Sequence, residues 1–472
     1  MSEDITCIIP IKGNQKIYLD IQNKCYAGGF QSMKTIDDIR KLAKDEEVEY
    51  IRMTFSDLNG SLKNVEIPIS LLDEALENKI KIDGSSITGF LPIQNSDMYL
   101  HPDLNTWTIY PWITTGGKTA ALICDVYNRD GTPFAGDPRF VLKRLNQSLT
   151  DIDCGHLNVG AEMEYFLFKA DESGKPTDTL NDQASYFDVY PDDNGEACRR
   201  ETVNTLKQMG FQIEADHHEV APGQCEIDFR FDDAVFTADR IQLLKLATKA
   251  IAVKYGLRAT FMPKPKAGMN GSGMHLNTSL FKDGKNLFDD SKGSHGLSSL
   301  ALNYLAGILA HAQAFTAITN PTINSFKRLV PGFEAPTYVA WAVDNRTALV
   351  RVPDGRGPAT RFELRSGDPS ANPYLAISAL LASGLDGIQR QLTPNKNVED
   401  SIYNMTPEQR TDAKIVELPS SLPAALANLK NDDILAKSLG SVVPKYLEIK
   451  QDELTNYQMS VTDWEKKTYF NV

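Results

Sequence analysis

The sequence lacks several patterns that would restrict its function at once. It has no Cys-x-x-Cys pair, and its six cysteines are scattered over 472 residues, which is typical of reduced thiols and gives no support for a zinc site. No apolar run reaches membrane-spanning length, and the first residues lack the basic-then-apolar order of a secretion signal. We therefore expect a cytoplasmic protein without a membrane partner.

Common nucleotide and nucleophile motifs are missing as well. The chain has neither a GxGxxG opening a helix nor a GxxxxGK[ST] loop, which excludes a Rossmann fingerprint and a P-loop, and it has no GxSxG elbow. A bound nucleotide must therefore be held by metal ions and arginines. The net charge of −13 disfavours direct nucleic-acid binding but leaves small anionic substrates open.

The chain is long enough for two or three domains. Residues 1–32 differ in composition from the rest of the chain, and two interpretations stay open: a genuine N-terminal extension, or an upstream leader with Met33 as the true initiator. The turn-rich stretch 128–133 predicts a boundary between a small mixed α/β unit and a larger second domain. The predicted strands are 8–11, 17–21, 50–55, 63–67, 106–113 and 119–126, and the predicted helices begin at Thr35 or span 69–77 and 138–150.

The stretch 159–168 is the most informative one. It reads Val-Gly-Ala-Glu-Met-Glu-Tyr-Phe-Leu-Phe, and its apolar and aromatic residues predict a buried strand. Because side chains alternate along a strand, Glu162 and Glu164 leave the same face. Two buried carboxylates repel each other and lose hydration, and a Mg²⁺ or Mn²⁺ ion would offset both costs. The alternative is an exposed strand end with two hydrated glutamates.

A second group of acids flanks a predicted hairpin. A strand runs into Pro222-Gly223, and the next strand, 224–231, alternates between acidic and apolar residues. We expect Glu219 and Glu226 to face each other across the turn. An edge hairpin with a hydrated acidic face is the alternative.

A glycine-rich loop and several arginines come next along the chain. The loop 268–273 carries three glycines, whose backbone N–H groups can approach an anion, and it leads into His275. In a later strand, Arg361, Glu363 and Arg365 share one face. Since arginine forks bind carboxylate and phosphate through two hydrogen bonds, the arginines indicate an anion site, with surface salt bridges as the alternative.

Taken together, these motifs resemble those of a known family. Over residues 34–472 the sequence is similar to type I glutamine synthetases of bacteria and archaea, in their shorter, non-adenylylated alpha form. The matching motifs are Asp83-Gly-Ser-Ser86, the strand with Glu162 and Glu164, His218-Glu219, Gly223-Gln-Cys-Glu226, Asn270–His275, Lys327–Pro336, Asn345-Arg346, Arg361–Arg365 and Asp368–Pro373.

The resemblance implies an α+β fold and an activity. It predicts an N-terminal β-grasp domain over 34–127 and a catalytic domain over 134–472, whose curved antiparallel sheet is of the glutamine synthetase/guanido kinase type. Two hexameric rings would stack into a homo-dodecamer, with each active site between neighbouring subunits. The implied reaction is ATP-dependent ligation of ammonia to L-glutamate: a γ-glutamyl phosphate intermediate gives L-glutamine, ADP and phosphate.

The resemblance also assigns roles to single residues. Two or more Mg²⁺ or Mn²⁺ ions would be held in each site, one by Glu164, Glu219 and Glu226 and a second by Glu162, His275 and Glu363. Substrate binding falls to Asn270, Gly271, Arg328, Glu334, Arg346 and Arg365, and ATP binding to Glu214, Ser279, Arg346 and Arg351. The implied catalytic residues are Asp83, which enters from the neighbouring subunit to take a proton from ammonium, Glu334, on a mobile flap, and Arg346.

Two positions depart from the family pattern. Cys225 stands where relatives often have histidine, and we expect its side chain to point away from the metals. Pro92 stands where feedback-inhibited members carry arginine. Two rival functions also stay open: a γ-glutamyl ligase for another amine, disfavoured by the intact Asp83 and Glu334, and a regulatory protein that binds a transcription regulator. A protein without catalysis would not need all six metal ligands, which are present.

Overall fold

The computed structural model describes residues 33–399 and 402–472. The strands predicted at 8–11 and 17–21 lie outside these residues and stay predictions. In the described part of the chain, no helix combines the length and the apolar character that a membrane crossing needs.

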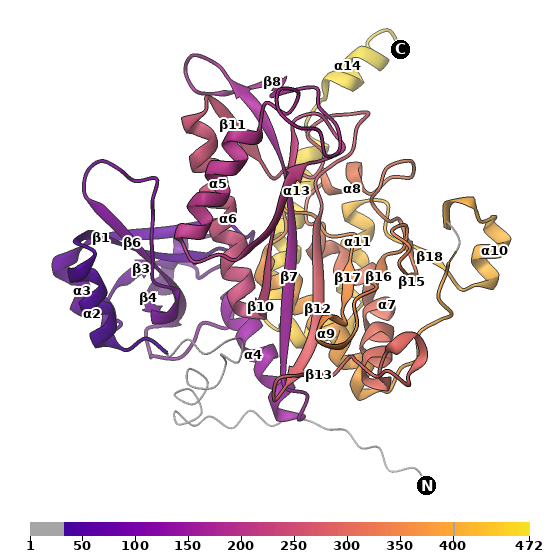
Figure 1. Cartoon of the computed structure of the whole chain (residues 1–472), viewed down its shortest axis with the longest axis horizontal. Coiled ribbons are helices and arrows are strands. Elements are labelled where there is room, and N and C mark those ends of the chain that lie inside the picture. Colours follow the sequence, from indigo (N-terminus) through magenta and orange to yellow (C-terminus); the bar gives the residue numbers. More distant parts are fainter. Residues whose placement is uncertain (1–32, 400–401) are drawn as a thin grey trace.

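Residues 36–128 form the smaller unit, at the left of Figure 1. Helix α2 (Ile36–Asp45) begins after Thr35 as predicted, because Thr35 and Asp38 form a reciprocal capping box. The sheet order is β2 (Leu62–Pro68), β1 (Val48–Ser56), β6 (Lys118–Asn128), β4 (Asp97–Pro102) and β3 (Lys81–Asp83), with β5 (Thr108–Ile109) beside β6 and α3 (Leu72–Leu76) between β2 and β3. Strands β1 and β6 are parallel and the other neighbours are antiparallel.

Two predicted elements of this unit are wrong in extent. The strand expected over 106–113 is reduced to β5, because a 3₁₀ helix (Leu104–Thr106) precedes it and Pro111, which has no N–H to donate, comes shortly after it. The helix expected over 69–77 begins as a 3₁₀ helix (Ile69–Leu71) and becomes regular only in α3. Strands β3 and β4 were not predicted.

The larger unit is built on a curved, mostly antiparallel sheet that crosses the centre of Figure 1. Its order is β15 (Trp341–Val343), β16 (Val350–Val352), β17 (Phe362–Leu364), β12 (Met274–Lys282), β7 (His156–Ala170), β10 (Gln224–Asp233) and β9 (Ile213–His218). Three short strands pair beside this path, β8 (Pro176–Leu180) and β11 (Leu257–Thr260) with β7, and β13 (Lys285–Asn286) with β12. Strand β7 contains the predicted strand 159–168 and is the longest of them, so the other site-bearing strands are arranged around it.

Helices cover this sheet and supply most of the large core. The helices of this unit are α4 (Pro138–Asp151), α5 (Glu196–Gln208), α6 (Ala234–Lys254), α7 (Ser299–Thr319), α8 (Ser325–Arg328), α9 (Pro373–Gln389), α10 (Pro407–Asp412), α11 (Leu422–Lys430), α12 (Asp433–Leu439), α13 (Val442–Gln458) and α14 (Asp463–Tyr469). Helix α9 is buried almost throughout and packs against α4, α6, α7 and α12. A two-stranded ladder joins β14 (Tyr338–Val339) to β18 (Val416–Glu417).

A turn of the small unit docks on the start of α9. Asn372 caps α9, and its Nδ2 also donates to the carbonyls of Asp57 and Leu58. Gly60, in the same turn, has φ +82°, and a Cβ there would lie 2.7 Å from the Asn372 Cα. The Asp368–Pro373 motif therefore serves the contact between the two units.

A buried ion cluster also joins the two units. The Arg139 guanidinium of α4 contacts Asp103 at 2.8 Å, Asp125 at 2.6 Å and Asp239 at 2.8 Å. The Tyr374 hydroxyl donates to the same Asp239 at 2.6 Å. Such a buried cation is stable only while its partners remain in place, so the cluster fixes the relative placement of the units.

Candidate active site

The register of three neighbouring strands brings acids from distant parts of the chain together. On one side of β7, Glu162 and Glu164 pair with Asp228 and Glu226 of β10. On its other side, Glu162 pairs with His275 of β12. Because paired residues of adjacent strands leave the same face, the sheet presents a row of metal-binding side chains.

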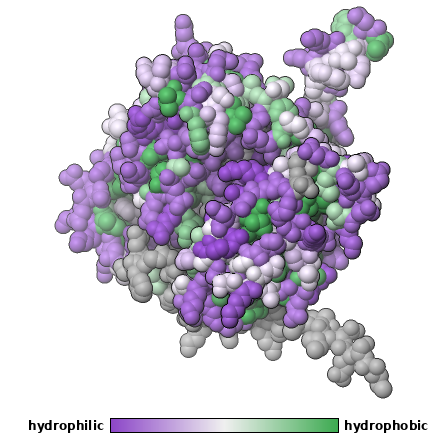
Figure 2. Space-filling view, turned by 45° about the vertical axis from the view of Figure 1, so that its right-hand side comes forward, coloured by the Kyte–Doolittle hydropathy of each residue, from purple (hydrophilic) through white to green (hydrophobic). Residues whose placement is uncertain are grey.

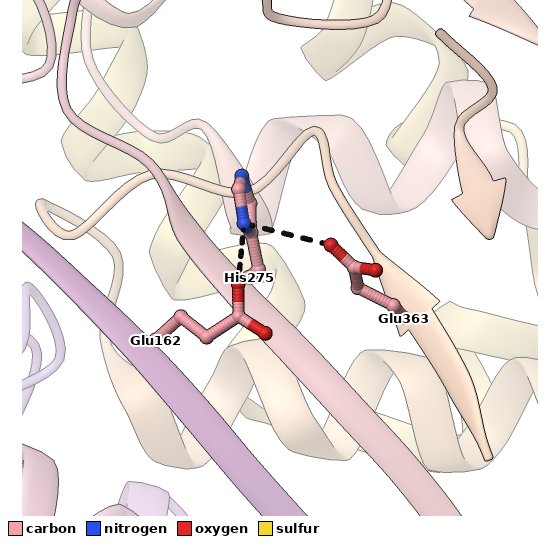
Figure 3. Close-up of side chains that lie close together, drawn as sticks. All are labelled: Glu162, His275 and Glu363. Carbon is pink, nitrogen blue, oxygen red and sulfur yellow. Dashed lines mark hydrogen bonds and ion pairs between the residues drawn. The ribbon is translucent and has the colours of Figure 1, made fainter. Parts of the chain in front are cut away.

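One predicted metal set is assembled as expected. The His275 Nδ1 lies 2.9 Å from Glu162 Oε2 and 3.7 Å from Glu363 Oε1, and the three side chains come from β7, β12 and β17 (Figure 3). Each offers one ligand atom, and these atoms lie within 4.8 Å of one another. Burial raises the pKa of Glu162, but the hydrogen bond and charge of His275 outweigh it and bring that pKa to about 2. A carboxylate held ionised beside an imidazole suits a divalent cation.

The other set differs in one member. The three ligand atoms that come together belong to His217, Glu219 and Glu226. Glu164 is turned aside, since its Oε2 accepts from the Gln224 Nε2 and from the Gly273 N–H, each at 2.8 Å. His217 was not among the predicted site residues, and because Glu219 lies in the turn beyond β9, the two-residue spacing of a strand could not have linked the two.

The predicted contact between Glu219 and Glu226 is correct in proximity and wrong in register. Strand β9 ends at His218, so the residue opposite Glu226 is His217. The Glu219 N–H donates to the Gln224 carbonyl at 2.8 Å and closes the hairpin. The carboxylate of Glu219 therefore reaches the cluster from the turn and not from the strand.

The electrostatics of this second cluster favour a bound cation. Burial, and then repulsion from Glu164, raises the pKa of Glu219 to about 7. The same two causes raise the pKa of Glu226 strongly, and Asp228 and Glu162 add to the repulsion. A divalent ion among these oxygens would offset the repulsion, so the residues present fit a bound metal.

A third group of metal-binding residue types, Asp182, Asp193 and His218, supports the hairpin that carries Glu219. His218 Nδ1 lies 2.6 Å from the Glu219 carbonyl oxygen and its Nε2 lies 3.1 Å from Asp182 Oδ1. Asp182 Oδ1 also accepts from the Gly223 N–H at 2.7 Å, while Asp193 pairs with Arg199 at 2.9 Å. These carboxylates are already engaged, so the group holds the hairpin that carries Glu219.

Two of the predicted arginines contact Glu363. Arg351 Nη1 lies 2.8 Å from Glu363 Oε2, and Arg365 Nη1 contacts Glu363 Oε1. Within the described residues, the buried Nε of Arg351 has no hydrogen-bond partner, as suits a donor that awaits an anion. Arg328 is buried and donates to the carbonyls of Ser366 and Arg365. Arg328 and Arg365 are therefore buried and form no surface salt bridges, and their binding roles stay predictions.

A closed cavity lies between the Gly-rich loop and the segment 333–335. It is lined by Glu164, Gln224, Asn270, Gly271, His275, Arg328, Phe333, Glu334, Ala335 and Arg365. Its free volume is about 20 Å³, which is room for about one water molecule, so an amino acid can enter only after some lining residues move. A Cβ on Gly271 would lie 2.1 Å from the Pro263 carbonyl oxygen, so the loop tolerates only glycine there.

The remaining predicted residues lie farther along the sheet or in the other unit. Ser279 is buried on β12, paired with Asn158, while Glu214 is exposed on β9 and Arg346 is exposed between β15 and β16. Asp83 ends β3 in the small unit, and none of the described residues that line the cavity comes from that unit. The roles of these four residues, like those of the other predicted site residues, stay predictions.

Cys225 is buried on the face of β10 opposite to Glu226. Its Sγ accepts from Arg199 Nη1 at 3.8 Å, and it belongs to the large core. The prediction that the Cys225 side chain points away from the metal-binding face agrees with the structure.

Fold and site together define a class of protein: a two-domain enzyme whose curved sheet carries divalent metal ligands beside arginines that suit phosphoryl and carboxylate groups. The family model of the glutamine synthetase catalytic domain matches residues 135–469, and that of the glutamine synthetase beta-grasp domain matches residues 47–129. The chain therefore belongs to the glutamine synthetase family.

Individual relatives agree with this assignment. A glutamine synthetase of Staphylococcus aureus (strain MRSA252) is 52% identical over 436 residues, which cover 92% of this chain and 98% of the relative. A glutamine synthetase of Staphylococcus epidermidis is 51% identical over the same share of each chain. Among solved structures, apo GmaS matches with a TM-score of 0.83 and 32% identity, covering 92% of this chain and 100% of that one. The activity implied by the motifs, ATP- and metal-dependent glutamate–ammonia ligation, is confirmed by this membership.

Proposed function

We propose that the protein forms glutamine through γ-glutamyl phosphate at the site between β7, β10, β12 and β17. The observation that carries the proposal is that two clusters of metal-binding side chains lie on one sheet, and that His275 of the first cluster lines a cavity together with Arg328 and Arg365. The γ-carboxylate of glutamate is already an anion and reacts poorly with ammonia, so it must first be activated by the γ-phosphoryl group of ATP.

Two groups of residues would hold Mg²⁺ or Mn²⁺. The first is Glu162, His275 and Glu363, and the second is Glu219 and Glu226 with Glu164 or His217. When bound, such ions neutralise charge on the phosphate oxygens. A turn of the Glu164 carboxylate away from Gln224 would be needed before it could join the second group.

The arginines bind and orient the anions. Arg328 and Arg365 face the cavity beside Asn270 and Gly271, so they are placed to hold the glutamate carboxylates. Arg351, which lies beside the predicted metal ligand Glu363, is assigned to a phosphate. We assign Arg346 to the phosphoryl group during transfer, and Glu214 and Ser279 to the nucleotide. The GmaS structure solved with ADP, 31% identical to this chain with a TM-score of 0.84, supports a nucleotide on this fold.

Ammonium is held and deprotonated by two carboxylates. Glu334 lines the cavity on the segment 333–335. Asp83 accepts hydrogen bonds from the Ser85 hydroxyl and N–H, which lower its pKa and keep it ionised to attract a cation. Because Asp83 belongs to the small unit, we assign it to the site of the neighbouring subunit.

We propose that the protein assembles as a homo-dodecamer of two hexameric rings. Helix α14 projects from the body in Figure 1, and its tip carries apolar side chains in Figure 2. Trp464 is 63% exposed and Phe470 83% exposed. Apolar side chains presented on a projection suit burial against a second copy. The resemblance alone carries two further proposals, a cytoplasmic location and a transcription regulator as a partner.

Phosphate release from ATP in the presence of glutamate and a panel of amines tests the function. We expect ammonia to support the fastest release with one glutamine formed per phosphate, and methylamine and diamines to be poor substrates. Faster turnover with another amine would assign the chain to the γ-glutamyl–amine ligases. No amine-dependent release by metal-loaded protein would contradict both functions.

We also predict weak feedback inhibition by glutamine. Pro92 has neither charge nor side-chain donor, so it cannot make the contacts of the arginine that feedback-inhibited relatives carry. Inhibition curves should show Pro92→Arg to be more sensitive to glutamine than the natural protein. Arg129, which lines the same hollow as Leu91, provides the control. Strong inhibition of the natural protein that is lost in Arg129→Ala would show that Arg129 replaces the missing arginine.

A further inference from the structure

Lys264 lies where the segment 333–335 meets the Gly-rich loop. It is 8% exposed, and its Nζ is 3.5 Å from the centre of the Phe333 ring. The same Nζ donates to the Met269 carbonyl, immediately before Asn270. One ammonium group therefore contacts both the loop that binds substrate and the segment that covers it.

The backbone of Lys264 is fixed independently of its side chain. Its N–H donates to Asn324 Oδ1 at 2.7 Å, and Asn324 Nδ2 donates back to its carbonyl at 3.0 Å. The preceding carbonyl, of Pro263, accepts from the Ser272 N–H at 2.9 Å. These hydrogen bonds hold the backbone of Lys264 between the Gly-rich loop and α8, which carries Arg328.

The charge of this side chain is not required for packing. Burial lowers the pKa of Lys264, and the neighbouring Arg328, itself a cation, lowers it further. A buried ammonium beside another cation is costly, and an apolar side chain of the same length would avoid that cost. The favourable contacts of the ammonium group are a carbonyl oxygen and the negative face of an aromatic ring.

We propose that Lys264 is a positioning residue that latches the flap 333–335: its ammonium holds the ring of Phe333 against the Gly-rich loop while the activated substrate waits for ammonia. This inference rests on the proposed acyl phosphate chemistry. Opening the flap separates the ring from the ammonium, so the contact favours the closed state by about twofold to thirtyfold. The cavity has room for about one water molecule and not for glutamate, so a latch on the flap must be weak enough to release, and a contact of this moderate strength is suitable.

An unlatched flap would admit water to the acyl phosphate. The water oxygen attacks the carbonyl carbon of the acyl phosphate, the bond from this carbon to the phosphate oxygen breaks, and phosphate leaves with the electron pair. One proton of the water passes to the departing phosphate and the other to solvent, and glutamate is regenerated. The net result is hydrolysis of ATP without formation of glutamine.

The test measures phosphate released per glutamine formed at limiting ammonia. The changes Lys264→Met and Phe333→Leu each remove the latch and should raise this ratio at least about twofold. In the double variant the ratio of phosphate to glutamine should be no higher than in either single variant, because both changes remove the same contact. The conservative changes Lys264→Arg and Phe333→Tyr keep a cation and a ring and should restore the natural ratio.

Lys249→Met is the matched control. Lys249 also places its Nζ over a phenylalanine ring, 5.7 Å from the centre of Phe261, but it lies on α6 away from the flap. Its replacement should leave the ratio unchanged. An equal loss of both products in Lys264→Met, or independent effects that multiply in the double variant, would overturn the latch. If Lys264→Met fails to fold, an unchanged ratio in Phe333→Leu overturns it. Failure of the natural protein to form glutamine would instead refute the proposed function.

Discussion

Replacing Glu226 by alanine is expected to abolish glutamine synthesis while the fold persists. Glu226 supplies one of three ligand atoms that lie within 4.8 Å of one another, and the other two belong to Glu219 and His217. Loss of the metal that this cluster would hold removes several kcal/mol of charge stabilisation from phosphoryl transfer. Since each ~1.4 kcal/mol is worth a factor of ten, the rate should fall by about a thousandfold or more. Glu219→Ala should behave in the same way.

Two measurements separate a lost metal from a lost fold. Titration with Mn²⁺ should show weaker binding at one site in Glu226→Ala, with the site of Glu162, His275 and Glu363 kept. The transition temperature of the metal-free protein should be unchanged or raised, because the change removes a carboxyl group whose charged form is disfavoured by burial and by neighbouring acids. Glu201→Ala is the control, since Glu201 is a partly exposed glutamate on α5 that pairs with Lys254. Normal turnover of Glu226→Ala at ordinary metal concentration would show that the ligand assignment is wrong.

Mixing two inactive variants is expected to restore activity. If Asp83 acts in the site of the neighbouring subunit while Glu219 acts in the site of the subunit that carries it, no single subunit supplies all the residues of one site. An Asp83→Ala chain keeps its metal ligands and can receive the intact Asp83 of a Glu219→Ala neighbour. In the proposed hexameric rings the contacts would be head-to-tail, so random equal mixing would give the productive order at about one junction in four. Co-expression should therefore recover roughly a quarter of natural activity.

The controls distinguish shared sites from partial activity of either parent. Variants assembled separately and then combined without subunit exchange should stay inactive. Two different tags on the subunits, purified in sequence, prove that the rings are mixed. A mixture of Glu219→Ala with Glu226→Ala should not complement, because both changes damage the same subunit's cluster. Mixed rings with no activity above the sum of the parents would refute the shared site.

The local part of this structure can be derived from the sequence. The capping box at Thr35 starts α2, and the alternation of 159–168 places Glu162 and Glu164 on one face of β7. Two-residue spacing is a property of any extended strand, so these features need no knowledge of the fold. Where the local signal was weak, as in 106–113 around Pro111, the predicted element was wrong in extent.

The motifs by themselves also identify the family. Long ordered matches, from Asp83-Gly-Ser-Ser86 to Arg361–Arg365, indicate glutamine synthetase, and the comparisons with known proteins confirm it. The set Glu162, His275 and Glu363 was assigned by motif, and the structure brings its three members together.

Only the tertiary structure decided how these residues meet. Register between strands that are distant in sequence set His217, and not Glu219, opposite Glu226. Hydrogen bonds from Gln224 and Gly273 turned the Glu164 carboxylate out of the second cluster. The contact of Lys264 with Phe333 joins residues from separate segments and left no periodic signal. Spacing along one strand is fixed by backbone geometry, whereas a carboxylate's direction and a cation's partner depend on neighbours that only folding supplies.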